Sequence, residues 1–360
     1  MSARVLSNPS QLVIRNCEWL SCNQLLVLGM PADGLGRELL QENIAEEVYG
    51  LTRDFSVYTA IKNDWSEESQ LTLQYGSEIE SLDKQWDGVL IFLQKSKPLM
   101  DFWLAMIASL LKEDTVVWLV GENSEGIKSW RKRLKQNFAA VKNMDNARHC
   151  SLIEASESLS NNTEFSKSEY YSAYELQVRG TPMPLFSLPG VFSHGRVDVG
   201  TAVLLDTFDT FDTFDTFDTG RVLDFGCGAG VVAGFLGQLN PDAHFTLVDS
   251  DALALESSTR TLQENNVQNF NVVASDGLSE VSGEFDLIVS NPPFHQGVKT
   301  HYAVTEQFLA ESAQRLRKGG ELRIVANSFL RYEPIIKQAF GDCKTLVVKK
   351  GFSIYQAFKR

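Results

Sequence analysis

The run Arg221-Val-Leu-Asp-Phe-Gly-Cys-Gly-Ala-Gly230 constrains the fold of this chain more than any other stretch. Apolar residues lead into three closely spaced glycines, and the apolar, helix-like segment 231–239 follows. A buried strand, a glycine-rich turn and a helix in this order form the nucleotide-binding corner of an open α/β sheet. Glycines let the backbone approach a ligand, and the helix N-terminus presents free N–H groups. A plain chain reversal is the alternative for the glycines alone.

The spacing of the glycines separates classes of nucleotide. The dinucleotide fingerprint G-x-G-x-x-G requires glycine at position 231, where this chain has Val231. Asp224, two residues before the first glycine, would repel a pyrophosphate but suits an ammonium group, such as the amino-acid end of S-adenosylmethionine. Both residues therefore disfavour an NAD-dependent oxidoreductase.

Two later predicted strands end in acids. Phe245-Thr-Leu-Val-Asp249 ends 19 residues after Gly230, and a carboxylate there can accept both ribose hydroxyls, unless Asp249 caps the next helix instead. Val272-Val-Ala-Ser-Asp276-Gly277 places Asp276 to face an adenine amino group, although Asp-Gly is also an ordinary turn. Successive parallel strands bring these acids to the edge where open α/β sheets bind ligands.

A fourth predicted strand, 285–290, ends in Asn291-Pro292-Pro293-Phe294. The prolines fix the backbone and donate no hydrogen bonds, so the Asn291 side-chain carbonyl and the Pro292 backbone carbonyl are paired acceptors. Two acceptors can hold an exocyclic amine and aim its lone pair at an electrophile, while Phe294 stacks on the base. A rigid turn explains the prolines but not the flanking Asn and Phe. His295 is either a proton acceptor or, in the plainer interpretation, a surface histidine.

The order of predicted strands repeats along the chain, which indicates an internal duplication of one α/β unit. Segments 25–29, 86–93 and 116–120 parallel segments 222–226, 285–290 and 321–325, and 100–111 has the apolar density of a buried helix. Chance likeness of two α/β domains is the alternative. The first copy has Leu26-Val27-Leu28 before its glycine instead of an acid, and Gln94-Lys95-Ser96 is the expected counterpart of Asn291-Pro-Pro, so it looks ligand-free.

The domain layout follows from composition. Residues 1–165 form the first predicted domain, the polar and proline-marked stretch 166–190 a connector, and residues 191–360 the second domain. Within the latter, 206–219 is a perfect Asp-Thr-Phe repeat whose period of three matches neither helix nor strand. We predict an inert loop there, with an extension of a helix end as the alternative.

These motifs together resemble class I S-adenosylmethionine-dependent methyltransferases that act on nucleobase or glutamine amines. With Leu188-Pro-Gly-Val-Phe-Ser193, Asp198-Val-Gly200 and Gly319-Gly-Glu-Leu-Arg-Ile-Val-Ala-Asn327 added, the chain resembles the family of small-subunit ribosomal RNA guanine-N2 methyltransferases over its whole length. The resemblance implies two tandem class I (Rossmann-like) methyltransferase domains, of which only the C-terminal one has an intact cofactor site. The Asp-Thr-Phe repeat departs from the family pattern.

The resemblance also implies S-adenosylmethionine as cofactor and N2 of guanine 1207 of 16S rRNA, in the small ribosomal subunit, as methyl acceptor. By match of motif, Asp224, Gly226 and Gly228 hold the methionine end, Asp249 the ribose and Asp276 the adenine. The predicted cofactor contacts are completed by Cys227, Gly230, Ser250, Gly277 and Asn291. The predicted catalytic residues, which orient the guanine amine and stack on its ring, are Asn291, Pro292, Pro293 and Phe294.

Charge and cysteine content limit the kinds of partner and compartment that the sequence allows. The net charge of −13 argues against a protein that coats nucleic acid, yet segment 291–360 has 12 Lys and Arg against 5 Asp and Glu, and a second basic cluster lies at 128–135. Each is a phosphate-binding surface or simply a solvated helix face. Five scattered cysteines predict no metal site and a reducing compartment, and no stretch is long enough to span a membrane. We therefore expect a soluble, monomeric, cytoplasmic protein.

Two rival functions remain open from the sequence. Asn-Pro-Pro-Phe also occurs in enzymes that methylate DNA adenine, protein glutamine or large-subunit rRNA guanine, and only the wider resemblance favours 16S rRNA. A non-catalytic RNA-binding ribosome-assembly factor is the rival from another class. The presence of Asp224, Asn291 and Pro292 disfavours that rival, because a silent copy need not retain them.

Overall fold

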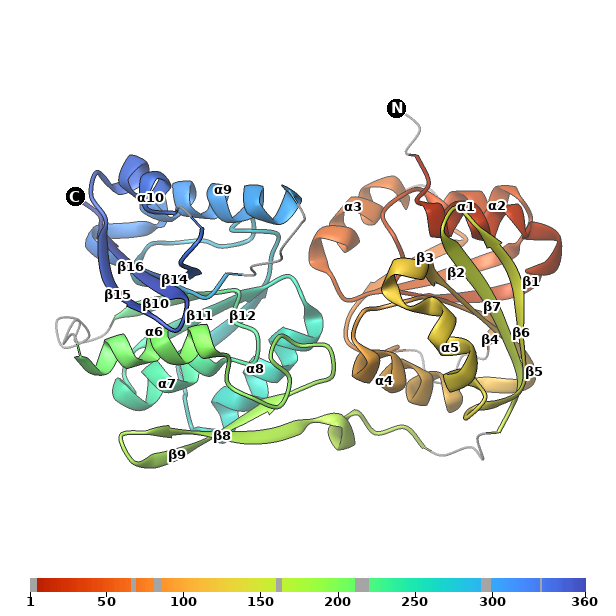
Figure 1. The fold of residues 1–360 in the computed structure, drawn as a ribbon, viewed down its shortest axis with the longest axis horizontal. Helices are drawn as coiled ribbons and strands as arrows, with labels where there is room; N and C mark the ends of the chain where they lie inside the picture. Colours follow the sequence, from red (N-terminus) through yellow and green to blue (C-terminus); the bar gives the residue numbers. More distant parts are fainter. Residues whose placement is uncertain are drawn as a thin grey trace. The chain divides into compact units, whose positions relative to one another are not determined.

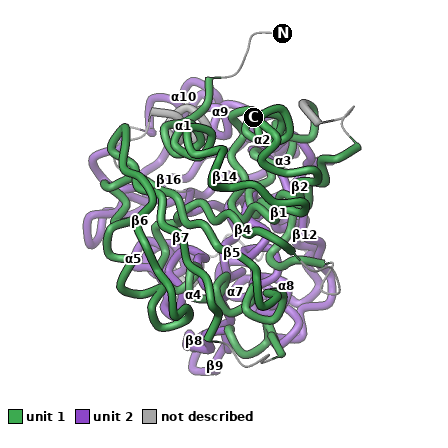
Figure 2. Tube along the Cα trace, turned by 90° about the vertical axis from the view of Figure 1, so that its right-hand side faces the viewer, with its two compact units in different colours: residues 1–170 green, residues 171–360 purple. Residues whose placement is uncertain are grey.

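The computed structural model describes residues 5–65, 69–80, 86–159, 164–210, 220–292, 299–330 and 332–360. The chain divides into two compact units, residues 1–170 and 171–360, each built around its own β-sheet (Figures 1 and 2). None of the helices in the described ranges is both long and apolar enough to cross a membrane.

Unit 1 contains a seven-stranded sheet with helices on both faces (Figure 1). Its strands are β1 (Cys22–Leu28), β2 (Ala45–Thr52), β3 (Leu71–Tyr75), β4 (Trp86–Phe92), β5 (Leu111–Glu122), β6 (Phe138–Ala147) and β7 (Cys150–Ser158). Its helices are α1 (Asn8–Arg15), α2 (Leu35–Gln41), α3 (Phe55–Trp65), α4 (Lys97–Ala108) and α5 (Ile127–Leu134), with short 3₁₀ turns at Cys17–Trp19, Asn123–Glu125 and Lys167–Tyr170. The strand order is β3-β2-β1-β4-β5-β7-β6; the first five are parallel, and the last two pairings are antiparallel.

Unit 2 repeats this architecture. Its sheet strands are β10 (Arg221–Phe225), β11 (His244–Asp249), β12 (Phe270–Ala274), β13 (Phe285–Ser290), β14 (Leu316–Asn327), β15 (Lys344–Lys349) and β16 (Phe352–Phe358). Its helices are α6 (Val199–Thr210), α7 (Val231–Leu239), α8 (Ala252–Glu264), α9 (Lys299–Arg315) and α10 (Glu333–Phe340). The order β12-β11-β10-β13-β14-β16-β15 is the same as in unit 1, position by position, which confirms the predicted tandem α/β fold.

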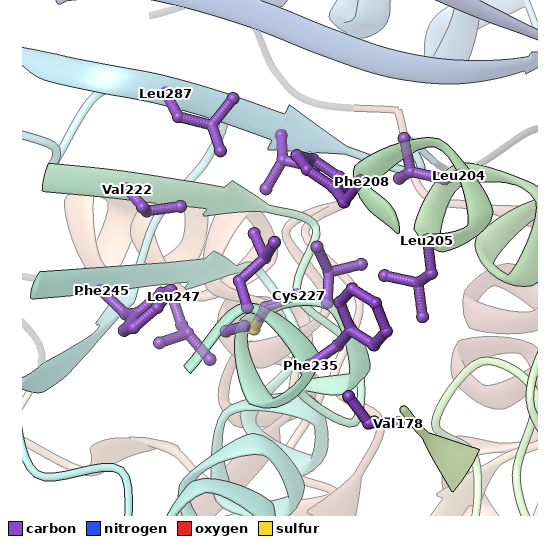
Figure 3. Packing of buried hydrophobic residues seen from close by; sticks show 14 of the residues in the cluster. Val178, Leu204, Leu205, Phe208, Val222, Cys227, Phe235, Phe245, Leu247 and Leu287 are labelled. Atoms are coloured by element: carbon purple, nitrogen blue, oxygen red, sulfur yellow. The ribbon is translucent and has the colours of Figure 1, made fainter. Parts of the chain in front are cut away.

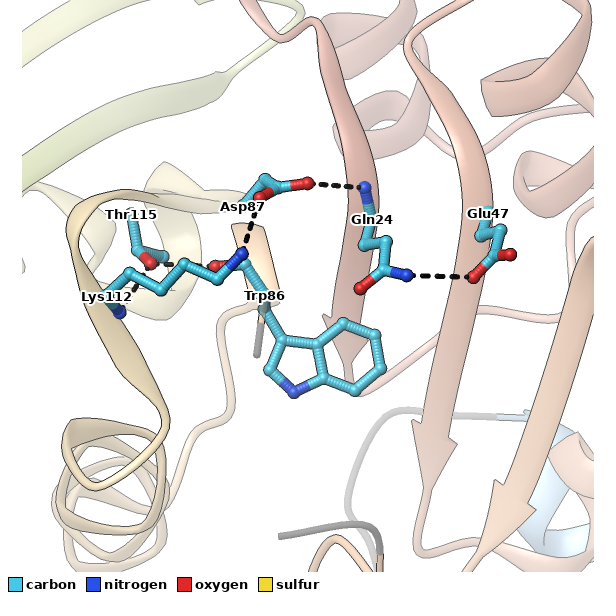
Figure 4. A network of polar contacts seen from close by, with 6 residues as sticks. All are labelled: Gln24, Glu47, Trp86, Asp87, Lys112 and Thr115. Carbon is cyan, nitrogen blue, oxygen red and sulfur yellow. Dashed lines mark hydrogen bonds and ion pairs between the residues drawn. The ribbon is translucent and has the colours of Figure 1, made fainter. Parts of the chain in front are cut away.

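The strand registers extend the duplication to single residues. In unit 1, Asp87 Oδ2 accepts a hydrogen bond from the Gln24 backbone N–H at 3.0 Å, and its Oδ1 pairs with Lys112 at 2.9 Å (Figure 4). In unit 2, Asp286 accepts from the Arg221 N–H at 2.8 Å and pairs with Arg317 at 3.2 Å. These residues occupy equivalent register positions, and both sheets have an irregularity at the same point. Chance likeness of two α/β domains does not explain this match.

The stretch predicted as a connector differs in the structure. Residues 172–187 form the hairpin of β8 (Ser172–Val178) and β9 (Thr181–Ser187). Val178, Met183 and Leu185 of this hairpin are buried in the hydrophobic cluster that β10, α6 and α7 also build (Figure 3). From Met183 to Ser187, buried residues alternate with partly buried ones along β9, as in a strand with one face on a core.

The Asp-Thr-Phe repeat is partly helical. Its first residues, 206–210, are the last turn of α6, so the alternative of a helix extension holds there, and residues 211–219 lie outside the described residues. Phe208 is buried under the Arg323 guanidinium, whose carbon lies 4.0 Å from the ring centroid, and Arg323 also donates to Thr207 Oγ1. Arg323 itself is fully buried against Glu321 at 2.6 Å. The first repeat therefore anchors α6 to β14.

Candidate active site

The glycine turn lies where β10 ends, between the ends of β11 and β13. The N–H groups of Gly226 and Cys227 both bond the Val248 carbonyl, at 2.8 and 3.0 Å, which fixes the turn to the neighbouring strand. Gly226, Gly228 and Gly230 have φ values of +70°, +53° and +73°, a region that side chains with a Cβ rarely adopt. The sequence requirement for glycine is therefore conformational at all three positions.

Two of these glycines differ in what surrounds them. A Cβ on Gly230 would lie 2.9 Å from the backbone of Ser258, because α7 packs closely on α8 at this point. A Cβ on Gly228 would meet no atom within 4 Å, so the backbone there borders open space. The Cys227 side chain turns away into the core, with its Sγ 3.7 Å from the Ser258 hydroxyl, and leaves only its backbone for a ligand.

Asp224 is almost completely buried in β10. Its Oδ2 accepts a hydrogen bond from the Ala233 N–H at 3.1 Å, so the carboxylate caps the first turn of α7. Burial raises the pKa of Asp224 from 3.8 to about 7; the bond from Ala233 lowers it and the nearby charge of Asp249 raises it. This capping bond is not predictable from the sequence pattern, and a contact between Asp224 and an ammonium group stays a prediction.

Asp249 ends β11 and faces the glycine turn. Its Oδ2 accepts from the Gly228 N–H and its Oδ1 from the Asp251 N–H, both at 3.0 Å. Burial raises its pKa from 3.8 to about 6, assisted by the charge of Asp251 and opposed by the backbone donors. Helix α8 is capped by Asp251, which accepts from Leu253, so Asp249 is not the helix cap. Each Asp249 oxygen retains a lone pair for a ligand hydroxyl.

The remaining predicted cofactor contacts lie along the same edge of the sheet. Ser250 follows Asp249 directly, and the Ser275 N–H bonds the Asp249 carbonyl at 3.1 Å, so the ends of β11 and β12 are joined. Asp276 is exposed and borders a cavity of about 440 Å³ that Leu278 and Ser279 also line. Gly277, with φ of +59°, has open space at its Cβ position. No described group of three or more His, Cys, Asp or Glu side chains is arranged to hold a metal.

Asn291 lies beside the glycine turn, with its backbone oxygen 4.0 Å from the position of a Cβ on Gly226. Its side-chain Nδ2 donates to Asp198 Oδ2 at 3.0 Å and to Thr201 Oγ1 at 2.8 Å. Because a carboxylate only accepts, the atom that faces Asp198 must be the amide nitrogen. Both amide protons are thus engaged, and Oδ1 is the part of the side chain left to bind a donor.

Asp198 and Thr201 are functional candidates that sequence analysis did not identify as such. Asp198 directly precedes α6 and Thr201 lies in its first turn, and Asp198 Oδ2 also accepts from the Thr201 N–H at 3.0 Å. The signal available in the sequence was the Asp198-Val-Gly200 motif quoted for the resemblance. Of the other predicted catalytic residues, Pro292 is buried, whereas Pro293 and Phe294, like His295, lie outside the described residues.

Unit 1 has different residues at the equivalent positions. The registers align Val27 with Asp224, Thr52 with Asp249, and Phe92 with Asn291. The predicted pairing of Gln94 with Asn291 is therefore wrong by two residues, because the apolar strand continues to Phe92. Gln94 instead fills space at the turn: its Nε2 lies 2.9 Å from the Cβ position of Gly29.

Family models and curated relatives match this chain over nearly its whole length. The family models "Methyltransferase small domain N-terminal" and "Methyltransferase small domain" match residues 10–174 and 182–356. Ribosomal RNA small subunit methyltransferase C of Colwellia psychrerythraea is 38% identical over 358 residues, and that of Hahella chejuensis 40% over 358 residues; each match covers 98% of this chain and 98% and 99% of the relatives.

A solved structure shares the fold. The Thermus protein described as "T. Thermophilus 16S rRNA N2 G1207 methyltransferase (RsmC) in complex with AdoMet and Guanosine" superimposes with a TM-score of 0.83 over 98% of this chain and 92% of that chain, at 22% identity. Three findings indicate the same family: two tandem sheets of one topology, the two family models, and curated relatives that match nearly the full length. The chain belongs to the ribosomal RNA small subunit methyltransferase C family.

Proposed function

We propose that this protein transfers a methyl group from S-adenosylmethionine to N2 of a guanine in 16S rRNA of the small ribosomal subunit, and that the guanine is number 1207. The relatives named small subunit methyltransferase C support the substrate class, and the Thermus structure with AdoMet and guanosine supports the cofactor and the base. The position of the target within the RNA rests on the name of that Thermus protein.

The residues at the glycine turn fit this cofactor. The open space at Gly228 admits the methionine portion, and Asp249, already bonded to the Gly228 N–H, is placed to accept ribose hydroxyls. Asp276 lies at the end of the next strand, where the adenine amino group would reach it. When bound, the cofactor supplies an electrophilic methyl group on a sulfonium.

The orientation of Asn291 is the observation that carries the proposal. With both amide protons held by Asp198 and Thr201, Oδ1 is left as an acceptor and would face the incoming substrate. Together with the Pro292 carbonyl it would hold the two protons of the guanine amine and direct its nitrogen lone pair toward the methyl group. Such positioning supplies most of the rate enhancement for a weak nucleophile, so a strong base is not required.

Transfer of label from tritiated S-adenosylmethionine to small subunits, large subunits and naked rRNA tests the proposal. We expect label in small subunits, at N2 of one guanine. Asn291→Ala should abolish transfer while cofactor binding survives through the other predicted contacts, whereas the exposed Asn271→Ala on β12 should retain activity. Label on large subunits would favour the large-subunit rRNA enzyme, and no label anywhere would favour a non-catalytic assembly factor.

Unit 1 is proposed to bind no cofactor. Val27, Thr52 and Phe92 replace the acids and the amide, and Gln94 and the Trp103 ring, which lies 3.2 Å from the Gly29 Cβ position, crowd the turn. Calorimetric titration should give one cofactor per chain. Asp249→Asn should weaken that one site, and a second site that survives the substitution would contradict the proposal.

The protein is further proposed to act as a monomer in the cytoplasm, where small subunits are found. Light scattering at the enzyme concentrations used for methylation should give the mass of one chain, 40.2 kDa. A mass of two chains under these conditions would contradict this proposal.

A further inference from the structure

An exposed aromatic side chain lies at the edge of the sheet where Asn291 is found. Phe329 lies in the turn after β14, two residues beyond its end, and is 64% exposed. Single exposed apolar side chains are common, so exposure alone says little. Its place is informative: β14 pairs with β13 with Ile324 opposite Ser290, so Asn291 and the turn that contains Phe329 both follow the same end of this strand pair.

A cationic turn stands next to Phe329. The chain reverses between β15 and β16 at Lys350 and Gly351, which have φ values of +52° and +82°. The Ser328 N–H bonds the Gly351 carbonyl at 2.9 Å, so the turn after β14 and the β15–β16 turn are held together. Lys350 is exposed at this point. We call Phe329 and Lys350 the edge patch.

The edge patch is connected to the residues that hold Asn291. Phe352, directly after the β15–β16 turn, lies with its ring 2.9 Å from the Cβ position of Gly200. Gly200 stands between Asp198 and Thr201 in the first turn of α6, and these two bind the Asn291 amide. A glycine is needed there because no side chain fits beneath the Phe352 ring. The patch and the candidate amine-binding residues therefore share one framework.

We infer that the edge patch binds the nucleotides that flank the target guanine, with Phe329 stacking on an adjacent base and Lys350 contacting a phosphate. The inference rests on the proposed function. A guanine whose amine reaches a buried site must leave its stack, which deprives the neighbouring base of a partner. An exposed ring one or two nucleotides away replaces that partner, and a lysine neutralises the backbone that must pass it.

The test compares Phe329→Ala and Lys350→Ala with matched controls at the opposite edge of the same sheet, Phe358→Ala and Lys318→Ala. Phe358 is 47% exposed and pairs with Glu321, at the opposite end of the β14–β16 pairing from Asn327. We expect Phe329→Ala to lower kcat/KM on small subunits by about 5- to 150-fold, the range that stacking on one base gives. Phe329→Trp should restore it, since any aromatic face stacks. The cofactor Kd should be unchanged in every variant.

Lys350→Ala should weaken binding of a 16S rRNA fragment and reduce the slope of log K against log salt by about 0.7, the value for one phosphate on a single strand. Equal effects of Phe329→Ala and Phe358→Ala, or wild-type kcat/KM in Phe329→Ala, would overturn the inference. The proposed function fails separately, if the wild-type protein labels no small subunit. In that case binding of the 16S rRNA fragment still tests the edge patch. An unchanged affinity for the fragment in both Phe329→Ala and Lys350→Ala would refute the inference.

Discussion

Asp198→Asn is the substitution that most directly tests the orientation of Asn291. The Asp198 carboxylate accepts from the Asn291 amide at 3.0 Å and from the Thr201 N–H at 3.0 Å. Asparagine has the same shape and is an equally good N-cap, so the first turn of α6 is retained. A neutral amide at position 198, however, can donate as well as accept. Either end of the Asn291 amide can then bond residue 198, so the orientation that leaves Oδ1 toward the substrate is no longer favoured.

The magnitude follows from the bond that is lost. A hydrogen bond to a charged group contributes about 1.5–3 kcal/mol, and each 1.36 kcal/mol in a barrier changes a rate about tenfold. If the whole preference for one amide orientation is lost, kcat should fall by roughly 13- to 160-fold. Thr201→Val removes a neutral bond of about 0.5–1.5 kcal/mol, so its effect should be smaller, roughly 2- to 13-fold.

Single-turnover methylation of small subunits measures these rates, and calorimetry measures cofactor affinity. We expect kcat to fall in Asp198→Asn while the cofactor Kd and the urea midpoint stay at wild-type values. Asp198→Ala serves as the comparison, because it also loses the helix cap and about 1 kcal/mol of stability. A wild-type rate in Asp198→Asn would refute the orientation mechanism, as would a loss of rate that only parallels a loss of stability.

Three other predictions follow from the same geometry. Gly228→Ala should lower cofactor affinity and cost only about 1 kcal/mol of backbone strain, because its Cβ enters open space. Gly230→Ala should lower the urea midpoint sharply, because its Cβ clashes with α8. The pKa values of Asp224 and Asp249 are raised to about 7 and 6, so between about pH 4 and 7 the folded, ligand-free protein binds protons that the unfolded chain has released. Its free energy of unfolding should therefore decrease as pH rises through this range, and the decrease should be smaller in Asp249→Asn. Phe208→Ala should cost about 3–5 kcal/mol in urea denaturation, although Phe208 lies in the repeat, because it packs beneath Arg323.

Local patterns were sufficient to predict most of the fold. The helix expected at 231–239 is found at Val231–Leu239, and the strand before Asn291 at Phe285–Ser290, because each joins a strong apolar pattern to a clear boundary of glycine or proline. The β8–β9 hairpin was missed since its prolines suggested irregular chain. The repeat misled at its first residues, because the packing of Phe208 is decided by Arg323, more than a hundred residues away in sequence.

The candidate site was predictable only for residues that follow strands. Asp249, Asp276 and Asn291 could be placed because parallel strands end at one edge. The partners of Asn291 could not, because Asp198 lies 93 positions earlier and reaches it through the entry to α6. The same limit applies to Asp224, whose carboxylate caps α7 through a contact that no spacing rule describes.

The duplicated units separate structural acids from those suited to a ligand. Asp87 and Asp286 have the same two kinds of partner, a backbone N–H and a cation from the next strand, although unit 1 has Val27 and Thr52 where unit 2 has Asp224 and Asp249. An acid that is present in both units, whatever residues border the glycine turn, supports the sheet. Thr52 in unit 1 occupies the position of Asp249 in unit 2. In both units the backbone carbonyl at this position accepts a hydrogen bond at 3.1 Å from the N–H of a residue just after the next strand. The fold at this corner therefore does not require the carboxylate, which agrees with the role in cofactor binding proposed for Asp249.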